Sequence, residues 1–397
     1  MNYEDDDSST NPLAPSTVPF NTEPSLVFDA LDIDLVLKVL KNTAFSPFFT
    51  FFIPILSYAQ RGNAEAPTVV WGSVWFVLVT LFWIFSFSST AWRNGMRSER
   101  VEWEDQIVLI TGGASGVGEL LANTLAVRNV TVIVLDIKTP FFDNDNINFY
   151  KCDVSNWEEV EAVAKQIVDE IGHPTVIINN AGVVQGKTVI DLDEKDVKQT
   201  MGVNVLAHFW TLKAFLPEMI KQKSGHVVTV SSTMGYVGAG RLADYVASKH
   251  ALIGLHESLR YELDNVHNTP RIRTTLLAPG YMQTALFSRS QYGSPNPPSA
   301  LPAWLFRFLA PQLAPHEVVK RVIAAIDLHQ SQDILMPFFV NVSQHARLLP
   351  SWGRDALQWI SGADHIMEGF VKVSGRREDE GPVPEVRSNG SGREKQD

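Results

Sequence analysis

The sequence predicts an α/β protein: a doubly wound parallel sheet preceded by an N-terminal membrane anchor. Three observations support this prediction. From about Val101, strand-like runs alternate with helical patterns, which is typical of stacked βαβ units. A glycine-rich turn follows the first of these strands. Upstream, the run from Thr68 to Trp92 contains no charged residue.

Length and composition limit the classes of function. The 397 residues suit one large domain with extra segments at its ends. A formal net charge of -11 excludes nucleic acid as the main partner, because phosphate binding requires clustered Lys and Arg. Cys152 is the only cysteine, so an intramolecular disulfide and a cysteine-based zinc site are excluded. The ten histidines show no HExxH spacing, and no metal site is predicted.

Four regions are predicted along the chain. Residues 1–27 are polar and lack an apolar period, which predicts a disordered tail. Residues 28–100 contain the amphipathic and transmembrane segments, and residues 101–372 form the α/β domain. Residues 373–397 are rich in Gly, Glu and Arg and are predicted to be a second disordered tail.

The anchor region contains two apolar stretches after a short amphipathic one at Leu31–Leu40. The first, Asn42–Gln60, is uncharged but is expected to be broken by Pro47 and Pro54. The second, Thr68–Trp92, would extend about 36 Å as a helix, enough to cross a hydrocarbon core of about 30 Å. This second stretch is the predicted membrane span.

Basic residues on either side of these stretches suggest their orientation. Arg93, Arg97 and Arg100 directly follow the second stretch, which predicts that the rest of the chain lies in the cytosol. Two arrangements are compatible with the sequence. If the first stretch also inserts, Lys38 and Lys41 lie on the cytosolic side and the two stretches form a hairpin. If only the second spans, the N-terminus is lumenal.

The predicted strands of the sheet are short runs rich in β-branched and aliphatic residues. They are Ile107–Thr111, Val130–Asp136, Thr175–Asn179, Val227–Ser231, Ile272–Leu277 and Ile334–Met336.

The first strand leads into Thr111-Gly112-Gly113-Ala114-Ser115-Gly116-Val117-Gly118, where a helical pattern begins. Glycines allow a tight turn and close approach to a pyrophosphate, and the helix N-terminus supplies N–H donors. This predicts a Rossmann-type dinucleotide site. The second strand ends in Asp136, where an acid would accept a hydrogen bond from the ribose 2′-hydroxyl and repel a 2′-phosphate. The sequence therefore favours NAD over NADP, although Lys138 keeps NADP as the alternative.

Three polar residues downstream suggest acid–base chemistry. Tyr245 and Lys249 have i,i+4 spacing in a helical segment, so both face the same side of that helix. An ammonium near a phenol favours the phenolate, which predicts a lowered pKa for Tyr245 and a role in proton transfer. Ser232 ends a predicted strand and could hydrogen-bond the reacting oxygen.

Taken together, these motifs resemble the short-chain dehydrogenase/reductase family, from about Asp105 to Thr284 and more loosely to Phe370. The resemblance implies that Tyr245 is the acid/base, that Ser232 orients the substrate oxygen, and that Lys249 lowers the pKa of Tyr245 and holds the nicotinamide ribose. It also implies that Asn204 holds a water in the proton relay and that Asp153 meets the adenine. The implied cofactor-binding residues are Thr111, Gly112, Ser115, Gly116, Val117, Gly118, Asp136, Asp153, Val154, Asn180, Ala181, Gly182, Tyr245, Lys249, Pro279, Gly280 and Thr284.

The apolar anchor, the acid after the second strand and the C-terminal segment from Met336 to Met367 resemble one branch of this family. It contains membrane-bound retinol dehydrogenases and 17-beta-hydroxysteroid dehydrogenases of the endoplasmic reticulum and lipid droplets. The resemblance implies hydride transfer between NAD and a lipophilic alcohol or carbonyl, such as a retinoid, a steroid or a long-chain lipid, at a membrane. It also implies a possible homodimer. Two alternatives are an NADPH-dependent lipid ketone reductase and a non-catalytic structural protein of membranes or lipid droplets.

The segment beyond Thr284 is expected to lie over the active site. It contains Leu286 and Phe287, and the run from Trp304 to Leu309 is apolar nearly all round. One interpretation is a lid that admits a lipophilic alcohol from the bilayer. The other is a helix packed in the core.

Overall fold

The computed structural model describes residues 31–95, 100–140, 142–282, 284, 286–287, 290, 298–368 and 370. The tails predicted at residues 1–27 and 373–397 lie outside the described residues. The chain divides into two compact units, Met1–Thr80 and Leu81–Asp397, which are described separately. The last turns of the long helix α3 (Pro67–Asn94) belong to the second unit.

The first unit contains α1 (Ile33–Asn42), α2 (Pro47–Arg61) and the beginning of α3. The side chain of Asp32 caps α1 by accepting from the backbone N–H of Leu35 at 2.8 Å. The chain bends by 58° between α1 and α2, and Pro47 opens the second helix, where its missing N–H has no cost. The expected break at Pro54 is wrong: Pro54 lies inside α2, which continues to Arg61.

Helix α2 and the first turns of α3 pack against each other in opposite directions. The indole N–H of Trp75 donates to the carbonyl oxygen of Ala44 at 3.0 Å, and the Phe45 and Trp75 rings lie 5.2 Å apart. Further along, the Phe51 and Phe76 rings lie 5.6 Å apart. The first unit is therefore a helical hairpin whose two arms are joined by residues 62–66.

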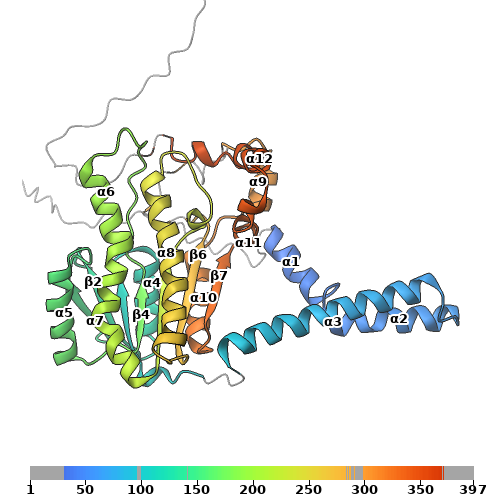
Figure 1. Cartoon of the computed structure of the whole chain (residues 1–397), viewed down its shortest axis with the longest axis horizontal. Helices are drawn as coiled ribbons and strands as arrows, with labels where there is room; N and C mark the ends of the chain where they lie inside the picture. The colour runs from blue at the N-terminus through green and yellow to red at the C-terminus, as the bar shows by residue number, and fades with distance from the viewer. Residues whose placement is uncertain are drawn as a thin grey trace, which may run out of the picture. The chain divides into compact units, whose positions relative to one another are not determined.

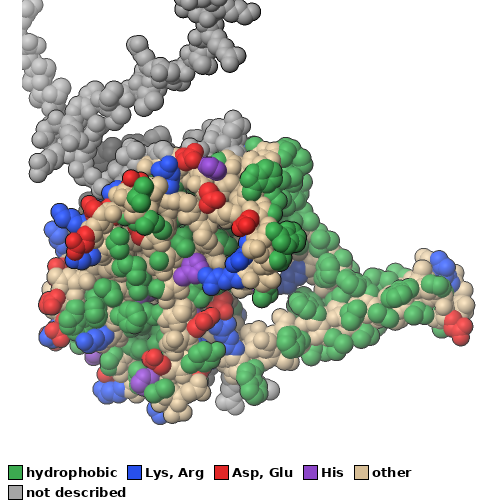
Figure 2. Space-filling model, turned by 45° about the horizontal axis from the view of Figure 1, so that its top comes forward, with side chains coloured by type: hydrophobic (Ala, Val, Ile, Leu, Met, Phe, Trp, Pro, Cys, Tyr) green, Lys and Arg blue, Asp and Glu red, His purple; other side chains and the backbone are tan. Residues whose placement is uncertain are grey.

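Helix α3 is long and apolar enough to cross a membrane, with a mean hydropathy of 2.0 over its most apolar window. Helices α1 and α2 together pass the same test as a bent pair, so the described residues contain one candidate span, or two if the pair is counted. Only 17% of the α3 window is buried within the protein, unlike a core helix of a soluble domain. Figure 2 shows hydrophobic side chains along α2 and α3.

The second unit is built on a seven-stranded parallel sheet with the strand order β3-β2-β1-β4-β5-β6-β7. This confirms the predicted doubly wound sheet. The sequence pattern missed one strand, β3, which lies at an edge and has mixed polar and apolar residues. The strands are β1 (Ile107–Thr111), β2 (Thr131–Asp136), β3 (Ile147–Lys151), β4 (Val176–Asn179), β5 (Gly225–Val230), β6 (Ile272–Pro279) and β7 (Gln332–Met336).

Helices cover both faces of the sheet (Figure 1). On one face, α4 (Gly116–Ala126) and α10 (Pro315–Asp327) bury a core that includes Leu121 and Val322. On the other, α5 (Trp157–Glu170), α7 (Ala207–Gln222) and α8 (Ala243–Tyr261) bury a second core around Phe215. The remaining helices are α6 (Glu194–Met201), α9 (Ala303–Leu309), α11 (Phe338–Ser343) and α12 (Ser351–Ser361).

The end of α3 is hydrogen-bonded to the chain that enters the edge strand β7. The side-chain amide of Asn94 accepts from the backbone N–H of Ser331 at 2.5 Å and donates to its carbonyl oxygen at 3.2 Å. Arg273 on β6 donates to the carbonyl oxygen of Asn94 at 2.8 Å, and Arg93 forms a two-pronged ion pair with Asp333. Residues Arg93 and Asn94 thus lie against β7 and β6.

Phe215 and Phe209 lie on the same helix but differ in burial, which provides a matched test of the second core. Phe215 is almost fully buried, whereas Phe209 is about half exposed. We expect Phe215→Ala to reduce the free energy of unfolding by about 3–5 kcal/mol, because it leaves a cavity in a packed core. Phe209→Ala should change it by far less. Thermal unfolding of both variants in detergent measures this difference, and equal melting temperatures would contradict the assigned core.

Candidate active site

The residues predicted to form the site all follow the carboxyl ends of strands or lie on helices that face this edge. The glycine turn follows β1, Asp136 ends β2, Asp153 and Val154 follow β3, and Asn180-Ala181-Gly182 follows β4. Ser232 follows β5, and Pro279 ends β6, with Gly280 and Thr284 beyond it. In a doubly wound sheet, ligands bind at this edge, where the strand order reverses. Here the reversal lies between β1 and β4.

A compact set of hydrogen bonds holds the loops after β1 and β4 together. The Thr111 hydroxyl accepts from the backbone N–H groups of Asn180 and Ala181, both at 3.0 Å. The Asn180 side-chain amide donates to the carbonyl oxygens of Thr111 and Gly112, both at 3.1 Å. These four bonds fix the position of the glycine turn relative to β4.

Two glycines of this turn are required by close backbone approach. Gly112 has φ of 66°, and a Cβ there would lie 2.8 Å from the Cα of Ala181. A Cβ on Gly118 would lie 2.4 Å from the carbonyl oxygen of Gly112. Helix α4 then begins after Ser115, whose side chain makes no capping hydrogen bond. The first N–H groups of α4 are therefore not capped by that hydroxyl, as a pyrophosphate site requires.

The two acids predicted to meet the adenosine are bonded to their own loops. Asp136 accepts from the backbone N–H of Ala114 and from that of Lys138, both at 3.0 Å, so its carboxylate is held beside the glycine turn. Asp153 accepts from the backbone N–H and the hydroxyl of Ser155, at 2.9 and 2.7 Å. Each ionised carboxylate retains lone pairs for further donors.

Asn204 lies in a short π-helical turn, Gly202–Leu206, between α6 and α7. Its side-chain oxygen accepts from the N–H of Val183 at 2.8 Å, and its NH₂ group donates to the carbonyl oxygen of Val183 and to the Ser248 hydroxyl. The side chain therefore ties the chain after β4 to α8. Turns of this kind recur at functional sites because they redirect one side chain within a helix.

Ser232, Tyr245 and Lys249 lie together as the motif predicts. The Ser232 hydroxyl is hydrogen-bonded with the Tyr245 side chain, and the Lys249 ammonium lies 5.5 Å from the centre of the Tyr245 ring. Lys249 also donates to the carbonyl oxygen of Val230 at 2.9 Å. Tyr245 and Lys249 are each only 3% exposed.

Burial dominates the electrostatics of this pair. It raises the pKa of Tyr245 to about 12, and the hydrogen bond with Ser232 offsets the rise only in part. The lowering of the Tyr245 pKa expected from the Tyr–Lys spacing is therefore wrong in direction, because desolvation by burial is the largest effect on the phenol. Burial also lowers the pKa of Lys249 to about 8.

An apolar cluster covers Tyr245, and the sequence analysis identified only part of it. The Phe287 ring meets the Tyr245 ring edge-on at 5.8 Å, and Leu286 packs in the same cluster. Val184, Leu242 and Met367 complete its buried part. These three come from distant parts of the chain, so no local pattern marked them. Trp304, which was expected in a lid or a core, is 71% exposed, whereas Phe306 on the same helix is buried.

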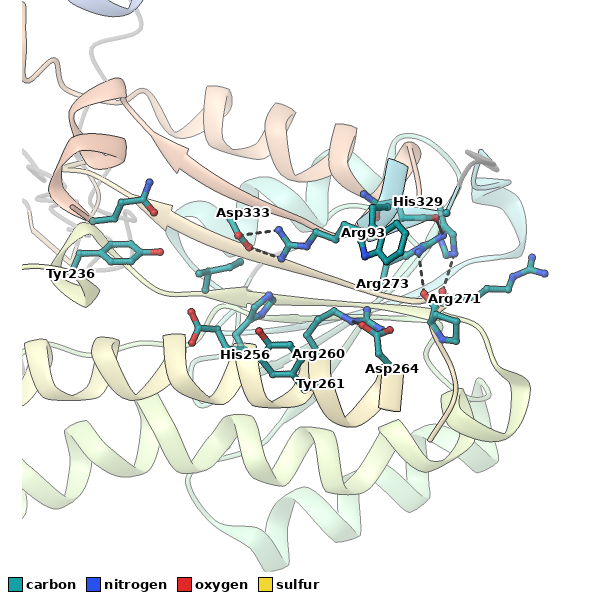
Figure 3. Close-up of a pocket in the computed structure, with 17 residues that line it drawn as sticks. Arg93, Tyr236, His256, Arg260, Tyr261, Asp264, Arg271, Arg273, His329 and Asp333 are labelled. Carbon is teal, nitrogen blue, oxygen red and sulfur yellow. Dashed lines mark hydrogen bonds and ion pairs between the residues drawn. The ribbon is translucent and has the colours of Figure 1, made fainter. Parts of the chain in front are cut away.

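One large cavity lies away from these residues. It has a volume of about 1160 Å³ and is lined by the end of α3, by α8 and by the beginnings of β6 and β7. Figure 3 shows Arg93, His256 and Asp333 around it. None of the four catalytic candidates lines this cavity.

A doubly wound sheet, a glycine turn at its reversal point and a Ser–Tyr–Lys group with buried Tyr and Lys define a nucleotide-dependent oxidoreductase of the Rossmann type. Comparison with known proteins agrees. The short chain dehydrogenase family model matches residues 106–293. The chain is 34% identical to epidermal retinol dehydrogenase 2 of Homo sapiens, over 67% of this chain and 85% of that protein. It is 31% identical to retinol dehydrogenase 10-B of Danio rerio, over 74% of this chain and 93% of that protein.

Among solved structures, a 4-hydroxyisoleucine dehydrogenase complexed with NADH shares the fold, with a TM-score of 0.51 and 24% identity, over 58% of this chain and 96% of that one. The chain belongs to the short-chain dehydrogenase family. It is an NAD(P)-dependent oxidoreductase that acts on CH–OH groups. The predicted resemblance to the retinol dehydrogenase branch is confirmed.

The buried ammonium predicts an unusual effect of pH on stability. Because the folded pKa of Lys249 lies below its usual value of 10.5, the unfolded chain binds more protons between about pH 8 and 10.5, and stability rises with pH in that window. We expect Lys249→Met to abolish turnover yet to stabilise the fold at pH 7 by about 2 kcal/mol, after allowing for the lost hydrogen bond. The gain should shrink as pH rises toward 10.5. Melting temperatures of both proteins at pH 7 and 9.5 test this, and a constant difference would contradict the assigned burial.

Proposed function

We propose that this protein transfers a hydride between NAD(H) and a lipophilic alcohol or carbonyl compound, of the retinoid, steroid or long-chain lipid class, at a membrane. The observation that carries the proposal is the Ser232–Tyr245–Lys249 group, in which Tyr245 and Lys249 are buried, at the sheet edge where the glycine turn and Asp136 also lie.

The cofactor cradle is assigned to residues at or after the ends of five strands, β1, β2, β3, β4 and β6. Thr111, Gly112, Ser115, Gly116, Val117 and Gly118 approach the pyrophosphate, and the N–H groups of α4 donate to it. Asp136 accepts from the adenosine ribose, and Asp153 with Val154 borders the adenine. Asn180, Ala181 and Gly182 form the floor after β4, while Pro279, Gly280 and Thr284 border the nicotinamide. Absence of a Cβ at Gly112 and Gly118 leaves the turn tight enough for this role.

Proton transfer is assigned to Tyr245. NAD⁺, when bound, would supply the acceptor for the hydride that leaves the carbinol carbon during oxidation. Ser232 hydrogen-bonds the substrate oxygen, Tyr245 takes the hydroxyl proton, and in the reverse direction the neutral phenol returns it. A raised pKa keeps that phenol protonated at neutral pH, which suits proton donation during carbonyl reduction. Lys249 steadies the phenolate form and holds the nicotinamide ribose. Asn204, which donates to the Ser248 hydroxyl, holds a water in the proton relay to Lys249.

The apolar cover over Tyr245 supports a lipophilic substrate. Phe287, Leu286 and Met367 pack in the apolar cluster that contains Tyr245, and the Phe287 ring meets the Tyr245 ring directly. Polar groups of a small hydrophilic alcohol would be left without partners there. A long apolar alcohol, in contrast, would make apolar contacts with the side chains of this cover.

The membrane location rests on α3 and on the helical hairpin it forms with α2. We assign the protein to the endoplasmic reticulum or lipid droplets, with the catalytic unit in the cytosol, because Arg93, Arg97 and Arg100 follow the span. The packing of α2 on α3 favours the hairpin over a single span, since both arms then enter from the same side.

Tyr245→Phe tests the proton-transfer assignment. We expect turnover to fall by at least 10³-fold, because the phenol oxygen is lost while the ring remains, and NADH binding to change by less than a few-fold. Turnover is followed by nicotinamide absorbance with detergent-solubilised protein and a panel of retinol, steroid alcohols and long-chain alcohols. Nucleotide binding is followed by fluorescence. Retained turnover in the variant would contradict the mechanism.

Asp136→Asn tests the cofactor preference. The amide oxygen can still accept from Ala114, but the charge that repels a 2′-phosphate is removed. We expect the ratio of kcat/KM for NADP to that for NAD to rise by at least tenfold, with NAD preferred by the unmodified protein. An equal loss with both cofactors would mean that Asp136 only shapes the loop, and a wild-type preference for NADPH would favour the lipid ketone reductase.

A further inference from the structure

We propose that α9, α11 and α12 together form a surface that docks onto the lipid headgroup and upper acyl region of the membrane. This tryptophan surface consists of Trp304, Phe338, Val342, Leu348, Trp352 and Trp359. The docking itself is argued without the proposed function. Its consequence, the delivery of a lipophilic substrate, rests on that function.

Large apolar side chains are exposed on these helices to an unusual extent. Trp304, Trp352 and Trp359 are 71%, 74% and 73% exposed, and Leu348 is 82% exposed. Figure 2 shows hydrophobic side chains over α9 and α12. Single exposed apolar residues are ordinary, but a gathered group of this size marks an interaction site. The prevalence of tryptophan points to a membrane interface, where its amphipathic ring is favoured.

The sequence of α12 has the pattern of a helix that lies flat on a lipid surface. Trp352 and Trp359 are seven residues apart and therefore share one side of the helix. Asp355, three residues after Trp352 and four before Trp359, lies on that side as well, whereas Arg354 and Gln358 lie on the other side and Gly353 is buried against the protein. Two exposed tryptophans on one side of a short surface helix, with a basic residue on the helix, favour a position at a membrane interface.

The charge of this region is opposite in sign to that of the chain. Residues 298–312 and 338–361 contain Arg307, Arg347 and Arg354 but only one acid, Asp355, whereas the whole chain has a net charge of -11. A local excess of arginine beside exposed tryptophans complements anionic phospholipid headgroups. In a symmetric dimer this surface would face its own copy and the arginines would repel one another, so we commit to lipid as the occupant.

The surface begins close to the point where the candidate span ends. Trp92 and Arg93, in the last turn of α3, line the same cavity as Gln344, which directly follows α11. The ion pair between Arg93 and Asp333 crosses this cavity (Figure 3). Lipid around the end of α3 would therefore lie across this cavity from the end of α11, the helix that carries Phe338 and Val342.

The same segment is joined to the cover of the active site. Gln358 on α12 donates to the carbonyl oxygen of Gly238 at 3.0 Å, and Asp364 accepts from the N–H of Gly240. Residues 238–240 precede Tyr245, and Met367 packs in the cluster over it. A lipid-docked α12 would thus place the apolar cover beside the layer in which a lipophilic alcohol dissolves.

The docking test uses the full chain in lipid nanodiscs that contain one copy each. Cys152 is buried, and burial is the largest of the effects that raise the pKa of its thiol to about 12. This thiol should therefore resist labelling. A fluorophore is attached through Trp352→Cys, and a control fluorophore through Lys165→Cys on the exposed side of α5. We expect phospholipids brominated on the upper acyl chain to quench the label at position 352 at least threefold more than the control.

Equal quenching at the two positions would overturn the proposal. Quenching at position 352 that requires two copies per disc would also overturn it, in favour of a protein interface. Discs with and without anionic lipid separate the contribution of the arginines, and we expect stronger quenching when anionic lipid is present.

A second measurement tests the consequence for substrate delivery. In the Trp304→Ala/Trp352→Ala/Trp359→Ala variant, we expect KM for a bilayer-partitioned alcohol to rise at least fivefold with kcat unchanged. Values for a short water-soluble alcohol should not change. Quenching at position 352 in a protein that oxidises no alcohol would support docking while contradicting the proposed function, so the two failures are distinguishable.

Discussion

The hydrogen bonds between Thr111 and Asn180 are the constraint on which the site depends. Strand order reverses between β1 and β4, so the loops that leave these strands diverge and must be held at a fixed separation. Two side chains meet this need by bonding to the backbone of the neighbouring loop. Gly112 and Gly118 can then approach Ala181 and each other closely, and the acid at the end of β2 is held beside the turn.

Burial of the proposed catalytic pair, Tyr245 and Lys249, shifts two pKa values in ways that both disfavour charge. The Tyr245 phenol is held neutral and the Lys249 ammonium is weakened by the same loss of solvent. Burial of an ammonium costs desolvation free energy, and a partner of opposite charge beside it, such as a phenolate, offsets that cost. A site of this kind is less stable than an apolar core would be.

Most of the sheet and the order of the site could be predicted from the sequence, because each rests on short local patterns. β1 was predicted with its observed bounds, whereas β3 was missed because an edge strand lacks a continuous apolar run. The pKa of Tyr245 is raised and not lowered because the phenol is buried, and the i,i+4 spacing of Tyr245 and Lys249 gives no information about burial. The cover over Tyr245 brings together Val184, Leu242 and Met367, which are far apart in the sequence, and such tertiary packing does not follow from composition. Nor does solvent exposure, and Trp304 proved exposed. The domain boundary near residue 100 and the homodimer stay predictions.

The bonds that Asn94 makes with Ser331 affect how the sheet ends. β7 pairs with β6 on one side only, and an open strand edge invites pairing with another chain. Asn94 satisfies both backbone groups of Ser331 just before β7, and Arg93 engages Asp333 within it. The end of α3 thereby protects the sheet from edge-to-edge aggregation. A shortened protein that begins after Gly95, made to avoid the apolar helices, would lose this protection and exchange one aggregation-prone surface for another.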